Sequence, residues 1–173
     1  MSLSCRFLHR LIIFFSFVCL AGAISVEATT VQKLSFDRLI READFIVRGR
    51  VEKLKSQQGA SGGSVTTVIT VSVEKQFKGS HVSSINIEQP GGSMGDMAQG
   101  VPGSPEFSPD EDVFLFLKRK RRGTFEVVGG KQGKFIAKPQ PDSNNWIVED
   151  FAHRTENLDT FVDRLTRLVK AGG

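Results

Sequence analysis

The stretch SVTTVITVSVEKQF, residues 64–77, has the clearest β-strand pattern in the sequence. Its side chains fall into two alternating sets, both rich in β-branched residues, which is typical of a strand. The more apolar set consists of Val65, Thr67, Ile69, Val71 and Val73, and the other of Thr66, Val68, Thr70 and Ser72. We predict a strand whose first face is buried and whose second face is partly covered or wet.

Further β-prone runs lie on both sides of this strand, separated by glycine, proline, asparagine or charged residues. Gly49 lies inside the first of them, where a glycine indicates a β-bulge or a sharp bend. The runs are DFIVRGRVEKLKS (44–56), HVSSINIEQ (81–89), DVFLFLKRK (112–120), TFEVVGG (124–130), GKFIAK (133–138) and NNWIVEDF (144–151).

Helical spacing of apolar residues occurs in two segments that flank these strands. Ser35 can cap a short helix over residues 35–43, and residues 156–173 form a longer amphipathic helix with Lys170 near its negative end. The apolar face of the longer helix consists of Leu158, Phe161, Val162, Leu165, Leu168 and Val169. Burying such a face stabilises its docking on another element.

Short strands at close spacing, with no helical segments between them, favour antiparallel pairing over a βαβ sheet. The predicted fold is therefore mainly β, of the α+β class. It is a small antiparallel OB-like barrel with a short N-terminal helix and a C-terminal amphipathic helix.

The first 28 residues have the pattern of a secretory signal peptide. Arg6 and Arg10 precede an apolar run over residues 11–24, and small residues suit cleavage after Ala23 or Ala28. A retained membrane anchor is the alternative, but a membrane span needs about 20 apolar residues. A lipid anchor is not expected, because small residues do not directly precede Cys19.

We therefore predict a signal peptide over residues 1–28 and a single domain over residues 29–173, exported to the periplasm or secreted, with no permanent membrane span. Both cysteines lie in the leader, so disulfides and thiolate catalysis are excluded for residues 29–173. Removal of the leader takes away two of the 23 bases and one of the 19 acids and leaves a net charge of +3. This mild excess indicates solubility more than nucleic-acid binding.

The order of the predicted elements resembles bacterial secreted domains of unassigned function and, more distantly, the netrin-like domains of tissue inhibitors of metalloproteinases. The likeness covers roughly residues 33–137. It rests on Ala43-Asp44 before the first strand, Phe77-Lys78-Gly79 closing the second, and Asp110-Glu111 before the apolar strand. The resemblance implies an OB-fold barrel. It does not carry over the inhibitory chemistry, which in that family needs an N-terminal cysteine.

The glycine- and proline-rich segment GGSMGDMAQGVPGSPEF, residues 91–107, is predicted to be a long connection between barrel strands. A loop longer than about 12–15 residues in a compact domain is usually functional or disordered. We therefore expect this segment to be mobile and to face a partner. The candidate partner-binding residues are Gly91, Gly92, Met94, Met97, Val101, Pro105 and Phe107.

Met94 and Met97 form an M-x-x-M pair that could bind Cu(I), with His81 as a third ligand and Trp146 nearby. The pair supplies only two ligands, and methionine also fills irregular gaps beneath loops. We treat these residues as weak metal candidates and predict no cofactor.

The segment KRKRR is the only dense run of charge: Lys118, Arg119, Lys120, Arg121 and Arg122. It is predicted to be the solvated tip of a hairpin that protects apolar strand ends from aggregation. An anionic partner is the alternative. We expect no nucleic-acid partner, because the chain is predicted to be exported, has no tyrosine and is only mildly basic.

No catalytic motif frames His81, His153 or Ser104, so we predict no catalytic residues and no enzyme activity. The favoured function is an exported, non-catalytic binding or regulatory module. Its partner is expected to be an extracytoplasmic protein, and a secreted peptidase is one option raised by the resemblance. The alternatives are a small extracytoplasmic copper-binding protein and a hydrolase with an unrecognised carboxylate site.

Overall fold

The computed structural model describes residues 33–59, 64–95, 97–141 and 143–172. The predicted leader lies outside these residues. All of the described residues belong to one compact unit, Gln32–Gly173. Among their helices, none is long and apolar enough to cross a membrane.

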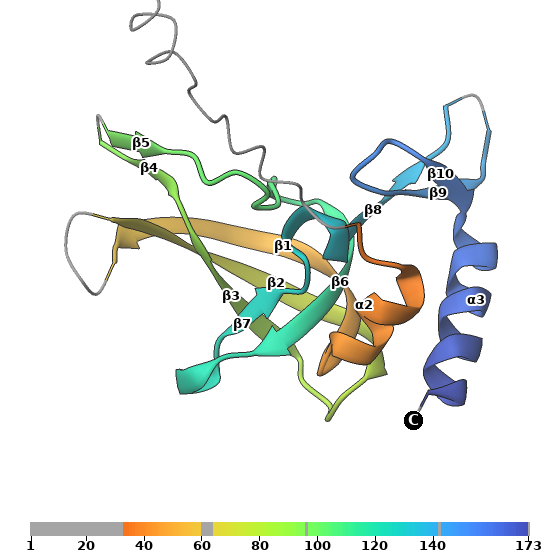
Figure 1. Ribbon diagram of the computed structural model, residues 1–173. Helices are drawn as coiled ribbons and strands as arrows, with labels where there is room; N and C mark the ends of the chain where they lie inside the picture. The colour runs from red at the N-terminus through yellow and green to blue at the C-terminus, as the bar shows by residue number, and fades with distance from the viewer. Residues whose placement is uncertain (1–32, 60–63, 96, 142, 173) are drawn as a thin grey trace, which may run out of the picture. The chain divides into compact units, whose positions relative to one another are not determined.

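Five strands close into a barrel in the order β1-β2-β3-β7-β6 and back to β1 (Figure 1). They are β1 (Phe45–Gln58), β2 (Val65–Lys78), β3 (Ser84–Pro90), β6 (Asp112–Arg119) and β7 (Phe125–Val127). The predicted mainly β, OB-like barrel is confirmed.

The barrel is mixed, so the expectation of purely antiparallel pairing is wrong at one place. Strands β3 and β7 run parallel and meet at Ile87 and Phe125, whereas the other neighbours round the barrel are antiparallel. The physical reason is the long connection from β3 to β6. It lets the β6–β7 hairpin return beside β3 in the same direction.

Strand β2 has the burial pattern that its sequence predicts. Val65, Thr67, Ile69 and Val71 are buried, and the residues between them are half-buried. The predicted bulge in β1 is also confirmed, since the register with β2 shifts between Arg48 and Gly49. A Cβ atom at position 49 would lie 2.2 Å from the backbone oxygen of Ser72, so the close approach of the two strands requires glycine.

Strand β6 is the wall shared by two hydrophobic cores. Val113, Leu115 and Leu117 belong to the inner core of the barrel, and Phe114 and Phe116 belong to the outer core on its other face. All five side chains are completely buried. A strand that is buried on both faces has a continuous apolar sequence, which explains VFLFL at residues 113–117.

Three further strands extend the sheet away from the barrel: β8 (Lys134–Pro139), β9 (Trp146–Glu149) and β10 (Thr155–Asn157). One half of β6 pairs with β8 and the other half with β7. Two 3-10 turns, η1 (Arg121–Gly123) and η2 (Gly130–Gly133), flank β7. A short hairpin of β4 (Gly92–Met94) and β5 (Met97–Gln99) projects from the connection between β3 and β6 (Figure 1).

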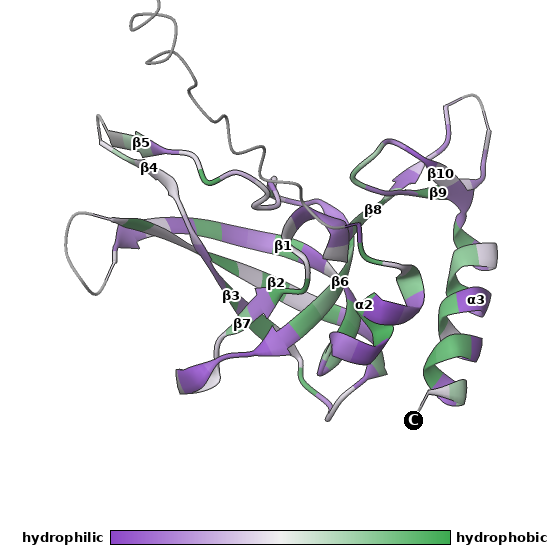
Figure 2. Cartoon of the chain, in the orientation of Figure 1, coloured by the Kyte–Doolittle hydropathy of each residue, from purple (hydrophilic) through white to green (hydrophobic). Residues whose placement is uncertain are grey.

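The two predicted helices are present, and both cover the outer core. Helix α2 (Phe36–Glu42) begins after Ser35, whose side-chain oxygen accepts a hydrogen bond from the backbone N–H of Arg38. Helix α3 (Leu158–Ala171) begins after Asn157, which caps it in the same way. Figure 2 shows hydrophobic and hydrophilic residues alternating along α3.

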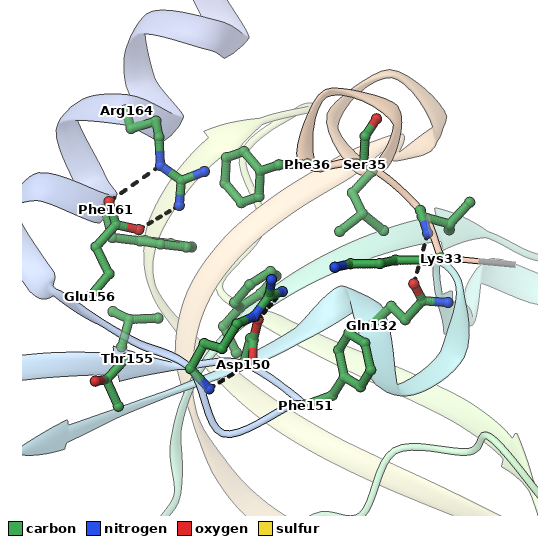
Figure 3. Close-up of a pocket in the computed structure, with 15 residues that line it drawn as sticks. Lys33, Ser35, Phe36, Gln132, Asp150, Phe151, Thr155, Glu156, Phe161 and Arg164 are labelled. Atoms are coloured by element: carbon green, nitrogen blue, oxygen red, sulfur yellow. Dashed lines mark hydrogen bonds and ion pairs between the residues drawn. The ribbon is translucent and has the colours of Figure 1, made fainter. Parts of the chain in front are cut away.

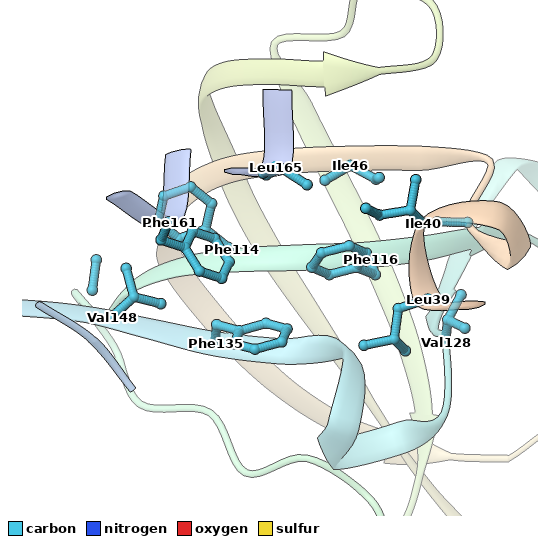
Figure 4. Packing of buried hydrophobic residues seen from close by; sticks show 12 residues of the cluster. Leu39, Ile40, Ile46, Phe114, Phe116, Val128, Phe135, Val148, Phe161 and Leu165 are labelled. Carbon is cyan, nitrogen blue, oxygen red and sulfur yellow. The ribbon is translucent and has the colours of Figure 1, made fainter. Parts of the chain in front are cut away.

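The buried residues of α3 are Phe161 and Leu165, and they pack into the outer core. The other buried members of the outer core are Leu39, Ile40, Ala43, Ile46, Phe114, Phe116, Val128, Phe135, Ala137 and Val148 (Figure 4). Aromatic rings dominate the centre of this core. Helix α3 is therefore an integral part of the folded unit and bounds one side of the outer core.

Candidate functional site

A pocket of about 510 Å³ opens at the edge of the outer core (Figure 3). Its walls come from the segment before α2, the η2 turn, strand β8, the turn between β9 and β10, and the beginning of α3. The volume lies in the range of small-ligand pockets, about 300–1,000 Å³.

The floor of the pocket is apolar and largely aromatic. The ring centroids of Phe36 and Phe161 lie 5.5 Å apart, and those of Phe135 and Phe161 lie 5.2 Å apart. Leu34, Leu39 and Val148 complete the floor. These side chains also belong to or pack against the outer core, so the floor is preformed and rigid.

One acidic side chain organises the turn between β9 and β10. The Oδ1 atom of Asp150 accepts hydrogen bonds from the backbone N–H groups of Ala152 (2.9 Å) and Arg154 (3.0 Å). The Arg154 guanidinium binds the other carboxylate oxygen at 2.5 Å. Burial alone would raise the pKa of Asp150, but the hydrogen bonds from Arg154 and Ala152 outweigh it and hold the pKa below its usual value.

A second ion pair joins β10 to α3. Arg164 binds both carboxylate oxygens of Glu156, at 3.3 Å from Nε and 2.5 Å from Nη2. The guanidinium also lies 4.0 Å from the centroid of the Phe36 ring. This stacking ties α3 to the first residue of α2 and fixes the position of the charge above the aromatic floor.

The same stack separates the pocket from a second hollow of about 350 Å³. That hollow is lined by Phe36, Asp37, Arg164, Arg167 and Leu168, between α2 and α3. Its lining contains two arginines and one acidic residue. The two hollows together follow the junction of the two helices.

The third basic residue of the pocket, Lys33, lies just before α2. Figure 3 shows its side chain reaching into the pocket. The backbone of this segment is held in place by the next residue, since the N–H of Leu34 donates to the side-chain oxygen of Gln132 at 2.8 Å. Gln132 is itself almost completely buried.

The predicted partner-binding loop is anchored along much of its length. Gly91 is buried, and its carbonyl accepts a hydrogen bond of 2.7 Å from Thr67 Oγ1. Pro105 is buried, Val101 is half-buried, and Phe107 packs against the inner core. Gly92 and Met94 lie on β4, and of the candidates with a described side chain only Met94 is well exposed, at 38%.

A buried lysine fastens the second half of this loop to strand β8. Lys134 Nζ lies 2.6 Å from Glu111 Oε2, donates to the Glu106 carbonyl, and lies 4.7 Å from the centroid of the Phe107 ring. Burial lowers the pKa of Lys134, and the Glu111 carboxylate partly offsets that effect. Partner binding through this loop stays a prediction, and Met94 is the one candidate residue with a described, well-exposed side chain.

The weak metal candidates are not all brought together. Met94 and Met97 are directly opposite each other in the β4–β5 hairpin, and the side chain of Met97 lies outside the described part of the structure. His81 precedes β3, whereas the hairpin follows β3. A strand of this length spans roughly 20 Å, which is far beyond a shared coordination sphere.

The predicted basic patch lies where the sequence suggests, at the tip of the β6–β7 hairpin. Arg119 stacks over the Phe45 ring at 4.9 Å, and Lys120 lies 3.6 Å from Glu126. The remaining candidates are Lys118, Arg121 and Arg122, of which the Arg122 side chain is not described. Part of the patch is therefore engaged in local contacts.

Both described histidines are exposed. His81 is exposed in the loop before β3. His153 is 87% exposed, and its Nδ1 lies 2.5 Å from Glu149. A hydrogen bond with Lys138 lowers the pKa of Glu149, with a smaller contribution from His153. Within the described ranges, no group of three or more His, Cys, Asp or Glu residues could hold a metal ion.

Sequence reasoning missed the pocket. In the sequence, His153 lies within a run of charged residues, and Phe36, Phe135 and Phe161 lie in three separate predicted elements. A usable signal was the spacing of opposite charges, since Asp150 and Arg154 are four residues apart and Glu156 and Arg164 are eight apart. Comparison with known proteins found no matching family model, no matching curated protein and no matching solved structure.

Proposed function

We propose that this chain is an exported, non-catalytic binding module that holds a protein partner at the pocket between the pre-α2 segment, the β9–β10 turn and α3. The observation that carries the proposal is the pocket itself, which combines a rigid aromatic floor with charged groups at its rim. Aromatic and arginine side chains in well-packed hollows are the usual anchors of protein interfaces.

The state of the pocket carboxylates favours binding over hydrolysis. Asp150 and Glu156 are each paired with an arginine, and the pKa of Asp150 is lowered by its hydrogen bonds. A general acid needs a raised pKa, as in glycosidases, where one carboxyl group must stay protonated near neutral pH. Carboxylates paired with arginine are suited to shaping a turn and orienting a guanidinium.

The sequence supplies the expectation of export, through the signal-like leader over residues 1–28. A secreted peptidase is the partner class suggested by the resemblance to netrin-like inhibitors. Residues 29–173 contain no cysteine, so any such contact would use chemistry other than the N-terminal zinc chelation of that family.

The test compares two exposed or half-exposed apolar residues on the rival surfaces. Phe151 lines the pocket, with Lys131 Nζ 5.7 Å from its ring, and Met94 lies at the tip of the β4–β5 hairpin. We expect Phe151→Ala to weaken capture of the partner from the exported fraction about tenfold or more, as a central contact would. Met94→Ala should leave capture unchanged.

Circular dichroism of both variants controls for folding. The opposite pattern, with loss only in Met94→Ala, would move the binding surface to the loop. Equal capture by wild type and by both variants would contradict a role for either surface.

A further inference from the structure

The rim of the pocket carries one more positive than negative charge. Its charged lining consists of Lys33, Arg154, Arg164, Asp150 and Glu156. The two arginines are each bound to one of the two acids, at 2.5 Å in both cases. Among the described residues, Lys33 alone of this set has no hydrogen-bond or ion-pair partner.

The Lys33 side chain places its positive charge inside the pocket. Figure 3 shows this side chain pointing into the pocket, and the Leu34–Gln132 hydrogen bond holds the adjacent backbone against the η2 turn. A ligand that lies on Phe36, Phe135 and Phe161 therefore has an ammonium group within reach.

Charge complementarity selects a ligand with a single negative charge. A dianion such as a phosphate monoester would be repelled by the two pocket carboxylates, and a cation would be repelled by Lys33. An apolar body is needed to cover the floor. Thr155 also lines the pocket and carries a hydroxyl group that suits a polar peptide backbone, which an alkyl chain lacks.

We infer that the pocket binds the C-terminal residue of the partner polypeptide, with its apolar side chain on the phenylalanine floor and its terminal carboxylate at Lys33. This inference rests on the proposed function. A C-terminal residue is the part of a polypeptide that carries an apolar side chain and a carboxylate together. Recognition of a free terminal carboxylate is a recurring way of binding peptides.

The test uses two matched probe peptides and the full chain. The first probe is acetyl-Ala-Ala-Ala-Phe with a free carboxylate, and the second is the same peptide with a C-terminal amide. Isothermal titration calorimetry at 150 mM salt should show the acid binding about fivefold to tenfold more tightly than the amide, as one charge-assisted contact in a partly exposed site allows.

Lys33→Gln should abolish this preference, so that the acid and the amide bind equally. Lys53→Gln is the matched control, because it removes the same charge from an exposed position on β1 outside the pocket. It should keep the full preference. Both lysines are exposed, so neither variant is expected to disturb the fold.

Three results would overturn the inference: equal binding of acid and amide by wild type, a preference that survives Lys33→Gln, or phenylpropionate binding as tightly as the peptide acid. If one of them occurs while Phe151→Ala still weakens partner capture, recognition of a C-terminal carboxylate is wrong and the proposed function stands. If Phe151→Ala also has no effect on capture, the proposed function fails as well.

Discussion

Replacement of Phe161 by alanine tests whether α3 and the pocket floor are an integral part of the fold. Phe161 is 1% exposed, and its ring centroid lies 5.5 Å from that of Phe36, 4.9 Å from that of Phe114 and 5.2 Å from that of Phe135. One side chain thus joins α3 to α2, to β6 and to β8.

The expected loss of stability follows from these contacts. A buried Phe→Ala change costs about 3–5 kcal/mol, including the cavity that it leaves. The partners of Phe161 are themselves rings in packed strands and helices, so the site has little room to collapse. We expect a loss of about 4 kcal/mol in the free energy of unfolding, a large part of the total of about 5–15 kcal/mol for a domain.

The assay is urea unfolding followed by far-ultraviolet circular dichroism and by the fluorescence of Trp146, the only tryptophan of the chain. Because the inner and outer cores share β6, both probes should give one coincident transition. Thr160→Ala, at an exposed position of the same helix, is the control and should change stability by less than about 0.5 kcal/mol. A loss below about 1 kcal/mol, or a separate early transition of Trp146, would refute this reasoning.

Three further changes test other parts of the structure. Gly49→Ala should destabilise the protein by about 2 kcal/mol or more in urea unfolding, since the new Cβ would lie 2.2 Å from the Ser72 backbone oxygen; a neutral effect would contradict the bulge. Asp112→Ala should cost about 3 kcal/mol in the same assay, because Asp112 is 5% exposed and binds Arg48 at 3.0 and 2.7 Å; an unchanged midpoint would show that the pair contributes little. The lowered pKa of Asp150 predicts stability that is full at neutral pH and is lost as the pH falls below about 4, and Asp150→Asn should reduce the difference between thermal melts at pH 7 and pH 3; an undiminished difference would count against this assignment.

Much of the barrel could be predicted from local patterns. The alternation in Val65–Lys78, the glycine in β1 and the cap at Ser35 each depend on nearby residues, and each is found where it was expected. The parallel pairing of β3 with β7 could not be predicted in this way. It depends on how the long connection routes the chain, and no local pattern encodes that route.

The continuous apolar run VFLFL, residues 113–117, shows the same limit. Its sequence indicates a strand buried on both faces, but not which neighbour covers each face. In the structure the even-numbered phenylalanines, Phe114 and Phe116, face the helices, and the odd-numbered residues between them face the barrel interior.

The spacing of its charged pairs is the one local signal of the pocket; its assembly could not be predicted from the sequence because it is built from distant segments. The hydrogen bond from Leu34 to Gln132 joins residues 98 positions apart, and Phe36 meets Phe135 and Phe161 only once the strands between them have folded. The sequence instead favoured the glycine-rich loop as the partner-binding site. Several of its side chains, such as Pro105, contribute to packing.

The most direct test of the binding site is amide chemical-shift mapping of the isotope-labelled full chain with the peptide acid acetyl-Ala-Ala-Ala-Phe. We expect the largest shifts in residues 33–36, in residues 150–156 and in the first turns of α3, around Phe161 and Arg164. Shifts confined to residues 91–107 or 118–122, with the pocket unaffected, would contradict it.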